Sequence, residues 1–163
     1  MTSARMKRHM KFHMANENET QTTDYGQRFL IFHRKFLSEF EIFRKGHNMP
    51  PVQAWNPATE IPAELAHSPR VTSFPFKADA MCATPAWLTT GGGILEDPLW
   101  SYTNLKQFAS LDELGRSIDF DWHNRVHRTI GGDMSTMHMS PFDPVFWCWH
   151  KWIDEITIRW EAR

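Results

Sequence analysis

Six of the nine histidines in this 163-residue chain follow a repeated pattern, in which a pair four residues apart is followed further along by a single histidine. On an α-helix, residues i and i+4 lie one above the other, about 6 Å apart along the axis, so the two imidazoles of such a pair can converge on one ion. The pattern therefore predicts two sets of three imidazoles. The sets are His9, His13 and His33 in the first part of the chain, and His123, His127 and His150 in the second.

A shared metal ion explains these histidines better than packing alone. Burying an imidazole without a hydrogen-bond partner costs about 1–3 kcal/mol, and His33 and His150 lie on or beside apolar helical stripes. Three neutral imidazoles suit zinc, copper, iron or nickel, and neither set contains the paired carboxylates typical of magnesium or calcium sites. Spacing alone does not separate copper from zinc. A frayed terminus rich in Met and His is the alternative for His9 and His13.

Five segments carry the helical spacing needed to hold these side chains, with apolar residues recurring at steps of three and four. They are 4–15, 27–45, 105–116, 119–130 and 145–162. Residues 50–98 contain eight of the ten prolines and the run Gly91-Gly92-Gly93, so long helices are not expected there. The sequence predicts a mainly α fold in a single domain over residues 1–163. Its core is a four-helix bundle that encloses the site, with long irregular Pro/Gly-rich loops.

Composition excludes several classes of partner. The net charge is -1, from 18 basic and 19 acidic side chains without long runs of one sign, which argues against nucleic acid and anionic membranes. The chain has no stretch of eighteen apolar residues, and its first twenty residues lack the apolar centre of a secretory signal, so we expect a cytoplasmic protein or one exported with help. Cys82 and Cys148 form no CxxC and are expected to be reduced. The eight tryptophans either line the core or cover a partner surface, so a homo-oligomer stays an option.

The segment 123–156, HNRVHRTIGGDMSTMHMSPFDPVFWCWHKWIDEI, resembles the second copper motif of the type 3 copper proteins, which are tyrosinases, catechol oxidases and haemocyanins. Their pattern is HNxxH, a glycine-rich turn, and then DPxFWxxHxxxD. The positions that fill it are His123, Asn124, His127, Asp143, Pro144, Phe146, Trp147, His150 and Asp154. Residues 28–41, RFLIFHRKFLSEFE, are similar to the first copper motif, FLxWHRxFLxxFE, with His33 in the ligand position.

The first copper site departs from the tyrosinase pattern. Tyrosinases place a second histidine nine residues before the third, and this chain has Asp24 there. Arthropod haemocyanins and phenoloxidases instead use an HxxxH pair followed by GxxFxxxH, which His9, His13 and residues 26–33 resemble. The resemblance therefore implies His9, His13 and His33 as ligands of copper A, with Asp24 as the alternative, and His123, His127 and His150 as ligands of copper B.

The resemblance implies two copper ions and O2 as co-substrate, without an organic cofactor. The expected activity is ortho-hydroxylation of phenols, or oxidation of catechols or o-aminophenols to quinones; the alternatives are a reversible O2 carrier and a degenerate protein with a single copper. Asn124 is expected to orient a water that deprotonates a phenol, with Glu113 as the candidate for its acidic partner. Arg128 either attracts a carboxylate-bearing phenol or is a solvated helix charge. Asp154 either supports a ligand-bearing helix or forms a surface salt bridge.

Overall fold

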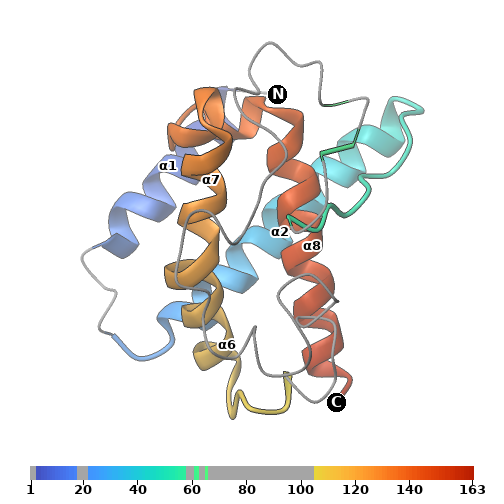
Figure 1. Cartoon of the computed structure of the whole chain (residues 1–163). Coiled ribbons are helices and arrows are strands. Elements are labelled where there is room, and N and C mark those ends of the chain that lie inside the picture. The colour runs from blue at the N-terminus through green and yellow to red at the C-terminus, as the bar shows by residue number, and fades with distance from the viewer. Residues whose placement is uncertain (1–2, 18–21, 58–60, 63–64, 66–104) are drawn as a thin grey trace.

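A computed structural model describes residues 3–17, 22–57, 61–62, 65 and 105–163 (Figure 1). Its helices are α1 (Ser3–Glu17), α2 (Tyr25–Gly46), α6 (Leu111–Ser117), a π-helical segment (Ile118–His123), α7 (Asn124–Ile130) and α8 (Pro144–Glu161), with 3-10 turns at Gly132–Ser135 and Ser140–Phe142. The described part of the chain contains no strand, so the prediction of a mainly α fold is confirmed. The predicted irregular region lies mostly outside the described residues, and none of the described helices is long and apolar enough to cross a membrane.

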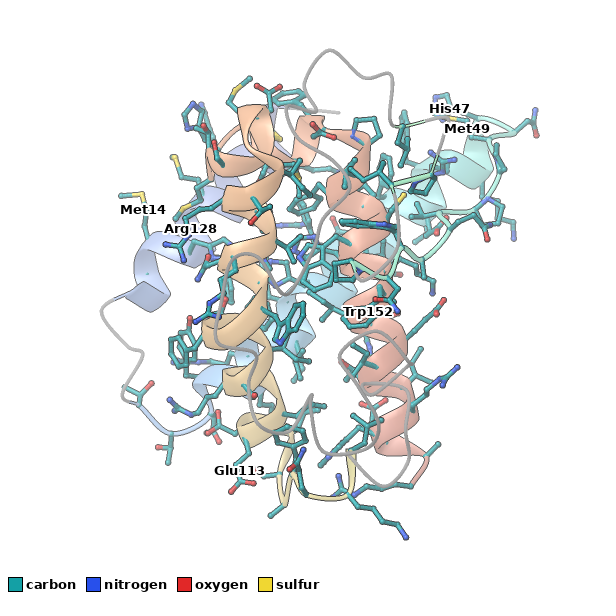
Figure 2. The ribbon with its side chains drawn as sticks, in the orientation of Figure 1. Met14, His47, Met49, Glu113, Arg128 and Trp152 are labelled. Carbon is teal, nitrogen blue, oxygen red and sulfur yellow. The ribbon has the colours of Figure 1, made fainter. Side chains whose placement is uncertain are left out.

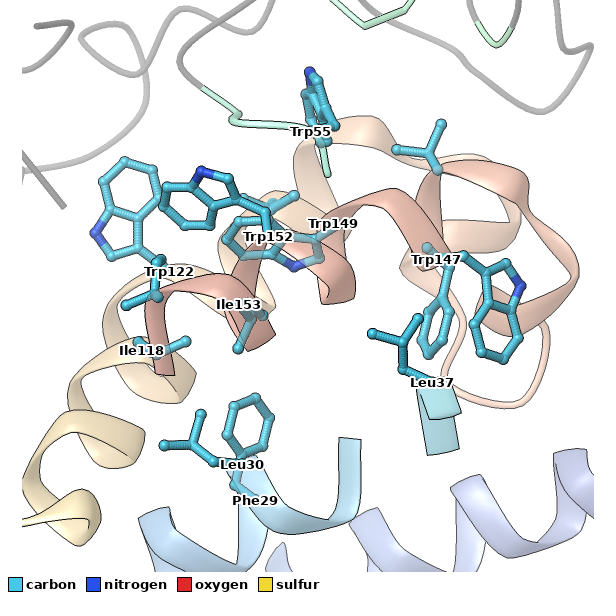
Figure 3. Packing of buried hydrophobic residues seen from close by; sticks show 14 of the residues in the cluster. Phe29, Leu30, Leu37, Trp55, Ile118, Trp122, Trp147, Trp149, Trp152 and Ile153 are labelled. Carbon is cyan, nitrogen blue, oxygen red and sulfur yellow. The ribbon is translucent and has the colours of Figure 1, made fainter. Parts of the chain in front are cut away.

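The core forms where α2 and α8 face each other and the rod made by α6, the π segment and α7. Helix α8 buries Val145, Trp149, Ile153 and Ile156, the spacing from which the helix was predicted. Figure 3 shows Trp122, Trp149 and Trp152 gathered near Ile118 and Ile153, with Phe29 and Leu30 of α2 opposite. The tryptophans at positions 55, 122, 147, 149 and 152 are all buried. These side chains therefore line the core rather than a partner surface.

The rod differs from the two separate helices that the sequence predicted at 105–116 and 119–130. Helix α6 begins only at Leu111, because the Ser110 hydroxyl accepts a hydrogen bond from the Glu113 backbone N–H at 3.1 Å and the Glu113 carboxylate accepts one from the Ala109 backbone N–H at 2.8 Å. This arrangement is a variant of the capping box, in which the glutamate bonds the backbone N–H of the residue before the N-cap. The helix then continues without a break through the π segment into α7. This rod ends at Gly131, which has a φ of 73°.

Helices α2 and α6 touch through their backbones at two glycines. A Cβ atom on Gly115 would lie 2.0 Å from the Gly26 carbonyl oxygen, and one on Gly26 would lie 2.1 Å from the Asp112 carbonyl oxygen. The Asp112 carboxylate also accepts a hydrogen bond from the Gly26 backbone N–H at 2.7 Å. This contact fixes the start of α2 against the rod, and so sets the position of Tyr25 relative to the π segment that follows α6.

Candidate metal centre

Helices α1, α2 and α8 and the rod all contribute histidines to one cluster of imidazoles, which lies between them. Five of the six rings are buried and that of His13 is half-buried. Helix α1 provides His9 and His13, α2 provides His33, the π segment provides His123, α7 provides His127 and α8 provides His150. The two triads predicted from spacing are thus brought together by segments that lie up to 141 positions apart in sequence (His9 to His150).

The cluster contains two groups of three nitrogen atoms that all lie within 4.8 Å of one another. The first is His9, His13 and His33, as the sequence predicted. The second is His33, His123 and His150, so His33 belongs to both groups. His127 lies just beside the second group, with its ring centroid 4.5 Å from that of His123 and 5.5 Å from that of His150. The structure therefore places all six predicted ligands together, with His33 at the junction of the two triads.

Hydrogen bonds at Nδ1 fix the orientation of five of the rings. An Nδ1–H group facing a carbonyl oxygen must donate, which leaves Nε2 with its lone pair free to bind a metal. The acceptors are the carbonyl oxygens of Met137 for His9 (3.1 Å), Phe29 for His33 (2.9 Å), Met134 for His127 (2.8 Å) and Phe146 for His150 (2.7 Å), and a carboxylate oxygen of Asp119 for His123 (2.9 Å).

In the described structure, Nε2 of His9 and of His13 lie 3.2 Å apart, whereas the other four Nε2 atoms lack a usual hydrogen-bond partner. Within the described part of the chain, Nε2 of His33 and Nε2 of His127 are buried without a hydrogen bond. Nε2 of His123 lies 3.1 Å from Nε2 of His150. Since both rings donate through Nδ1 when Asp119 is ionised, two lone pairs face each other there, an arrangement that a cation stabilises. The residues present therefore fit a metal ion that accepts neutral imidazoles.

Protons do not supply that positive charge near neutral pH. Burial, together with the neighbouring imidazoles, lowers the pKa of His33, His123 and His150 well below 6.5. Burial and the nearby His13 and His127 lower the pKa of His9 to about 2, and burial lowers the pKa of His127 to about 4. The imidazoles are thus held neutral, the form that binds zinc or copper.

Asp119 is a site residue that the sequence reasoning missed. Its side chain is buried, and it accepts hydrogen bonds from His123 Nδ1 and from the Tyr25 hydroxyl. Burial raises the pKa of the Asp119 carboxyl, against the opposing effect of the Tyr25 hydrogen bond. The only signal in the sequence is a spacing of four between Asp119 and His123, which is common on helices and therefore weak.

A cavity of about 210 Å³ opens onto the cluster from the side of α7. Its lining consists of His9, His13, His123, Asn124, His127, Arg128, Met134, Ser135 and Met137. Asn124 and Arg128 are exposed and lie where the sequence predicted, at the edge of the cavity beside the second histidine pair. The described lining contains four imidazoles, an amide and a guanidinium, and no carboxylate.

Two other candidates lie away from this cavity. Glu113 is exposed in the capping box of α6, ten residues before His123, which corresponds to about 15 Å of helix (Figure 2). Its carboxylate lies at the start of α6 and not in the lining of the cavity, so the structure does not favour Glu113 as the acidic partner of Asn124, and that role stays a prediction. Asp24 is exposed at the start of α2 with φ of 71°, and neither of the two nitrogen groups includes it. The structure thus favours His13 over Asp24 as the second member of the first triad.

Comparison with known proteins gives the family. Residues 48–163 match the family described as the common central domain of tyrosinase, a range that includes His123, His127 and His150 but begins after His33. The tyrosinase of Streptomyces lincolnensis is 29% identical over an alignment of 196 positions, which covers 91% of this chain and 70% of that protein. No solved structure matches.

Two shorter matches agree with this assignment. The tyrosinase of Streptomyces glaucescens is 51% identical over 41 residues, 25% of this chain and 15% of that protein. The G-type haemocyanin (units Oda to Odg) of Enteroctopus dofleini is 39% identical over 44 residues, 24% of this chain and 2% of that protein. With the family match covering most of its length, and with six imidazoles converging between its helices, the chain belongs to the tyrosinase family of type 3 copper proteins.

Proposed function

We propose that this protein binds two copper ions and uses O2 to oxidise catechols or o-aminophenols to quinones, and to hydroxylate phenols at the ortho position. The proposal is supported chiefly by the buried cluster in which Nε2 atoms of two triads converge beside an open cavity. In this proposal His9, His13 and His33 hold one copper, and His123, His127 and His150 hold the other.

The bound copper pair supplies the redox chemistry with O2. The chain contributes the remaining requirements, which are oriented ligands, a dry surrounding and a site for the substrate. The Nδ1 hydrogen bonds hold the imidazoles in one tautomer, and aromatic rings such as Phe29 and Phe146 pack directly against the cluster, with centroids 4.5 Å from His33 and 3.9 Å from His150. These contacts exclude water from the inner side of the site.

The cavity suggests which step is favoured. Hydroxylation of a monophenol requires that its proton be removed, and the described lining offers the Asn124 amide but no carboxylate to accept it. Removal of electrons from a catechol or an o-aminophenol makes its O–H and N–H protons far more acidic, so their loss during oxidation needs no strong base. We therefore propose that Asn124 orients the substrate hydroxyl and that oxidation of these substrates is faster than hydroxylation of monophenols.

Arg128 suggests a substrate that carries a carboxylate. The cavity is smaller than the roughly 300–1,000 Å³ of sites for drug-sized ligands, so it suits a single aromatic ring. Arg128 lies at its edge and is exposed, and its guanidinium can bind a carboxylate through two parallel hydrogen bonds. The proposed substrates are small phenolic or catecholic acids.

The test is copper loading followed by O2 uptake. We expect two copper ions per chain, and O2 consumption with catechol, with an o-aminophenol and with 3,4-dihydroxybenzoate. The His127→Ala variant should lose this activity while it keeps its helix content, because His127 Nε2 forms no hydrogen bond with any of the described residues. His47→Ala is the matched control, since His47 is exposed, its ring bonds to the Phe43 carbonyl at 2.8 Å, and it does not line the cavity.

The similarity to haemocyanins makes reversible O2 binding the second candidate function. A colour change that reverses on removal of O2, without quinone formation from any of the three substrates, would support it over the oxidase. A single copper per chain that His13→Ala does not change would instead indicate a protein with only the second site.

A further inference from the structure

Among the described residues, Asp119 is the only carboxylate that bonds to one of the six imidazoles. It lies in the π-helical segment four residues before His123, with 3% of its surface exposed. One carboxylate oxygen accepts from His123 Nδ1 at 2.9 Å, and the other accepts from the Tyr25 hydroxyl. Both oxygens therefore accept hydrogen bonds, and these two bonds fix the orientation of the carboxylate.

The partner of His123 differs in kind from those of the other rings. The Nδ1 atoms of His9, His33, His127 and His150 all face backbone carbonyl oxygens. A hydrogen bond to an ionised carboxylate is roughly twice as strong as one between neutral groups. It also places negative charge behind the ring, which increases the electron density at Nε2. His123 is thus the most strongly donating ligand of the cluster.

Tyr25 is itself held firmly in place. Its ring stacks on that of Phe120 with centroids 5.3 Å apart and an angle of 3°, and the Arg116 guanidinium lies 5.6 Å from its centroid. The neighbouring Gly26 is locked against Gly115 by backbone contact. The close crossing of α2 and α6 therefore delivers the Tyr25 hydroxyl to Asp119.

We infer that Asp119, supported by Tyr25, is a positioning residue for the metal centre: it holds His123 in the Nδ1–H tautomer, directs Nε2 into the cluster and strengthens metal binding at one of the two triads. The inference rests on the proposed metal site but not on any reaction with O2. π-helical segments occur frequently at functional sites, and this one carries both the carboxylate and the ligand that it orients.

The experiment is a competition titration of the full chain with Cu(I) and a chelator, comparing wild type with Asp119→Asn. Loss of such a partner typically weakens metal binding 10–100-fold, so we expect one of the two binding steps to weaken by that factor and the other to stay unchanged. Glu41→Gln is the matched control: it replaces a half-buried carboxylate on α2 that accepts a hydrogen bond from the Val52 backbone N–H at 2.9 Å and lies outside the described cluster of imidazoles. Both of its binding steps should match wild type.

The tautomer provides a second measurement, independent of metal affinity. In Tyr25→Phe the Asp119 carboxylate remains and loses the hydrogen bond from the Tyr25 hydroxyl, so this variant serves if Asp119→Asn does not fold. Imidazole ¹⁵N shifts in the chelator-treated protein should change for His123 and for His150, whose Nε2 faces it, and stay constant for His9. One binding step should weaken by a smaller factor than in Asp119→Asn. Unchanged ¹⁵N shifts of His123, or both binding steps within twofold of wild type in either variant, would overturn the inference.

The outcomes separate this inference from the proposed function. A protein that binds two copper ions, shows the predicted loss in Asp119→Asn and consumes no O2 with any phenol refutes the oxidase while the role of Asp119 stands. A protein that oxidises catechols, and in which Asp119→Asn binds both ions as tightly as wild type, refutes the role of Asp119 alone.

Discussion

Removal of metal should make the fold of this protein strongly sensitive to mild acid. All six clustered imidazoles have a pKa lowered by burial, to about 4 for His13 and His127, to about 2 for His9, and well below 6.5 for the other three. Below pH 6.5 the unfolded chain therefore binds protons that the folded protein does not. The free energy of unfolding rises with pH wherever the unfolded state binds more protons than the folded state. The contribution of the six imidazoles is therefore complete above pH 6.5 and is lost as the pH falls below it.

The size of the effect follows from the number of imidazoles. Between pH 7.5 and 5.5 each imidazole that stays neutral in the folded state and titrates at 6.5 in the unfolded state contributes about 1.4 kcal/mol, so six contribute about 8 kcal/mol. A domain of this kind is stable by only about 5–15 kcal/mol in total. The raised pKa of Asp119 acts in the opposite direction, but it is one group against six. Glu39 and Asp112 have lowered pKa values and lose their contribution only in more acidic solution.

Urea denaturation of the chelator-treated protein, followed by circular dichroism at pH 7.5, 6.5 and 5.5, measures this directly. The free energy of unfolding should fall by several kcal/mol across the range, with unfolding in buffer alone near pH 5.5. Saturation with Zn(II) is the control, because a metal that binds only the folded state stabilises it and opposes protonation. A change below about 2 kcal/mol in the metal-free protein would refute the reasoning, since it would mean that the imidazoles are not held neutral in a common buried cluster.

Three further predictions concern single residues. Gly115→Ala should destabilise the protein by about 2–3 kcal/mol or more, because its Cβ would lie 2.0 Å from the Gly26 carbonyl oxygen. Gly46→Ala is the control and should change the free energy of unfolding by less than about 1 kcal/mol, because a Cβ there meets nothing within 4 Å. Arg128→Gln should lower kcat/KM for 3,4-dihydroxybenzoate about tenfold through loss of a charge-assisted hydrogen bond, and leave catechol unaffected; equal losses on both substrates would contradict carboxylate recognition. Glu113→Ala should lower stability by about 1 kcal/mol through loss of the capping box and leave copper binding and O2 uptake unchanged, so a selective loss of phenol hydroxylation would support its catalytic assignment.

The helices and the six histidines could be predicted because their signals are local and periodic. Steps of three and four mark the buried faces of α2 and α8, and Asp143 and Pro144 mark the start of α8, where the Asp143 carboxylate accepts from the Val145 backbone N–H at 3.0 Å. The capping box at Ser110 and Glu113 was also local and legible as S-x-x-E. Glu113 was predicted as a site residue from the family resemblance, whereas the local S-x-x-E pattern indicates the start of a helix.

The features that escaped prediction depend on contacts between segments far apart in the chain. No local pattern distinguishes the π-helical turn from an α-helical one, and it joins two segments that the sequence predicted as separate helices. The bond between Tyr25 and Asp119 links positions 94 apart and exists only because two glycines let α2 and α6 touch. Likewise, spacing assigned His33 to one triad, whereas packing places it between both.

Asp154 supports the site from outside the cluster of imidazoles. Its carboxylate accepts from Arg34 Nε at 2.6 Å, and Arg34 also binds Glu161 at 2.8 Å. Arg34 follows His33 on α2, and Asp154 lies one turn beyond His150 on α8. Of the two roles predicted for Asp154, support of a ligand-bearing helix is the one that this contact favours, because it braces the two helices beside the rings that pack with centroids 4.6 Å apart.

The first triad depends on metal more than the second does, because of how α1 is attached. Among the α1 residues whose side chains the structure describes, only Met6 and His9 are buried, so one of the two buried side chains of α1 is itself a proposed ligand. The other contacts of this helix include the stacking of Phe12 on Phe32, with centroids 3.9 Å apart, and a half-exposed ion pair of Arg8 with Glu39 at 2.6 Å, which contributes little. The second triad stands instead on the rod and α8, whose buried faces form the core. Metal binding at the first triad would therefore contribute directly to the docking of α1, and in the metal-free protein this helix should be the first part of the bundle to unfold as the pH falls.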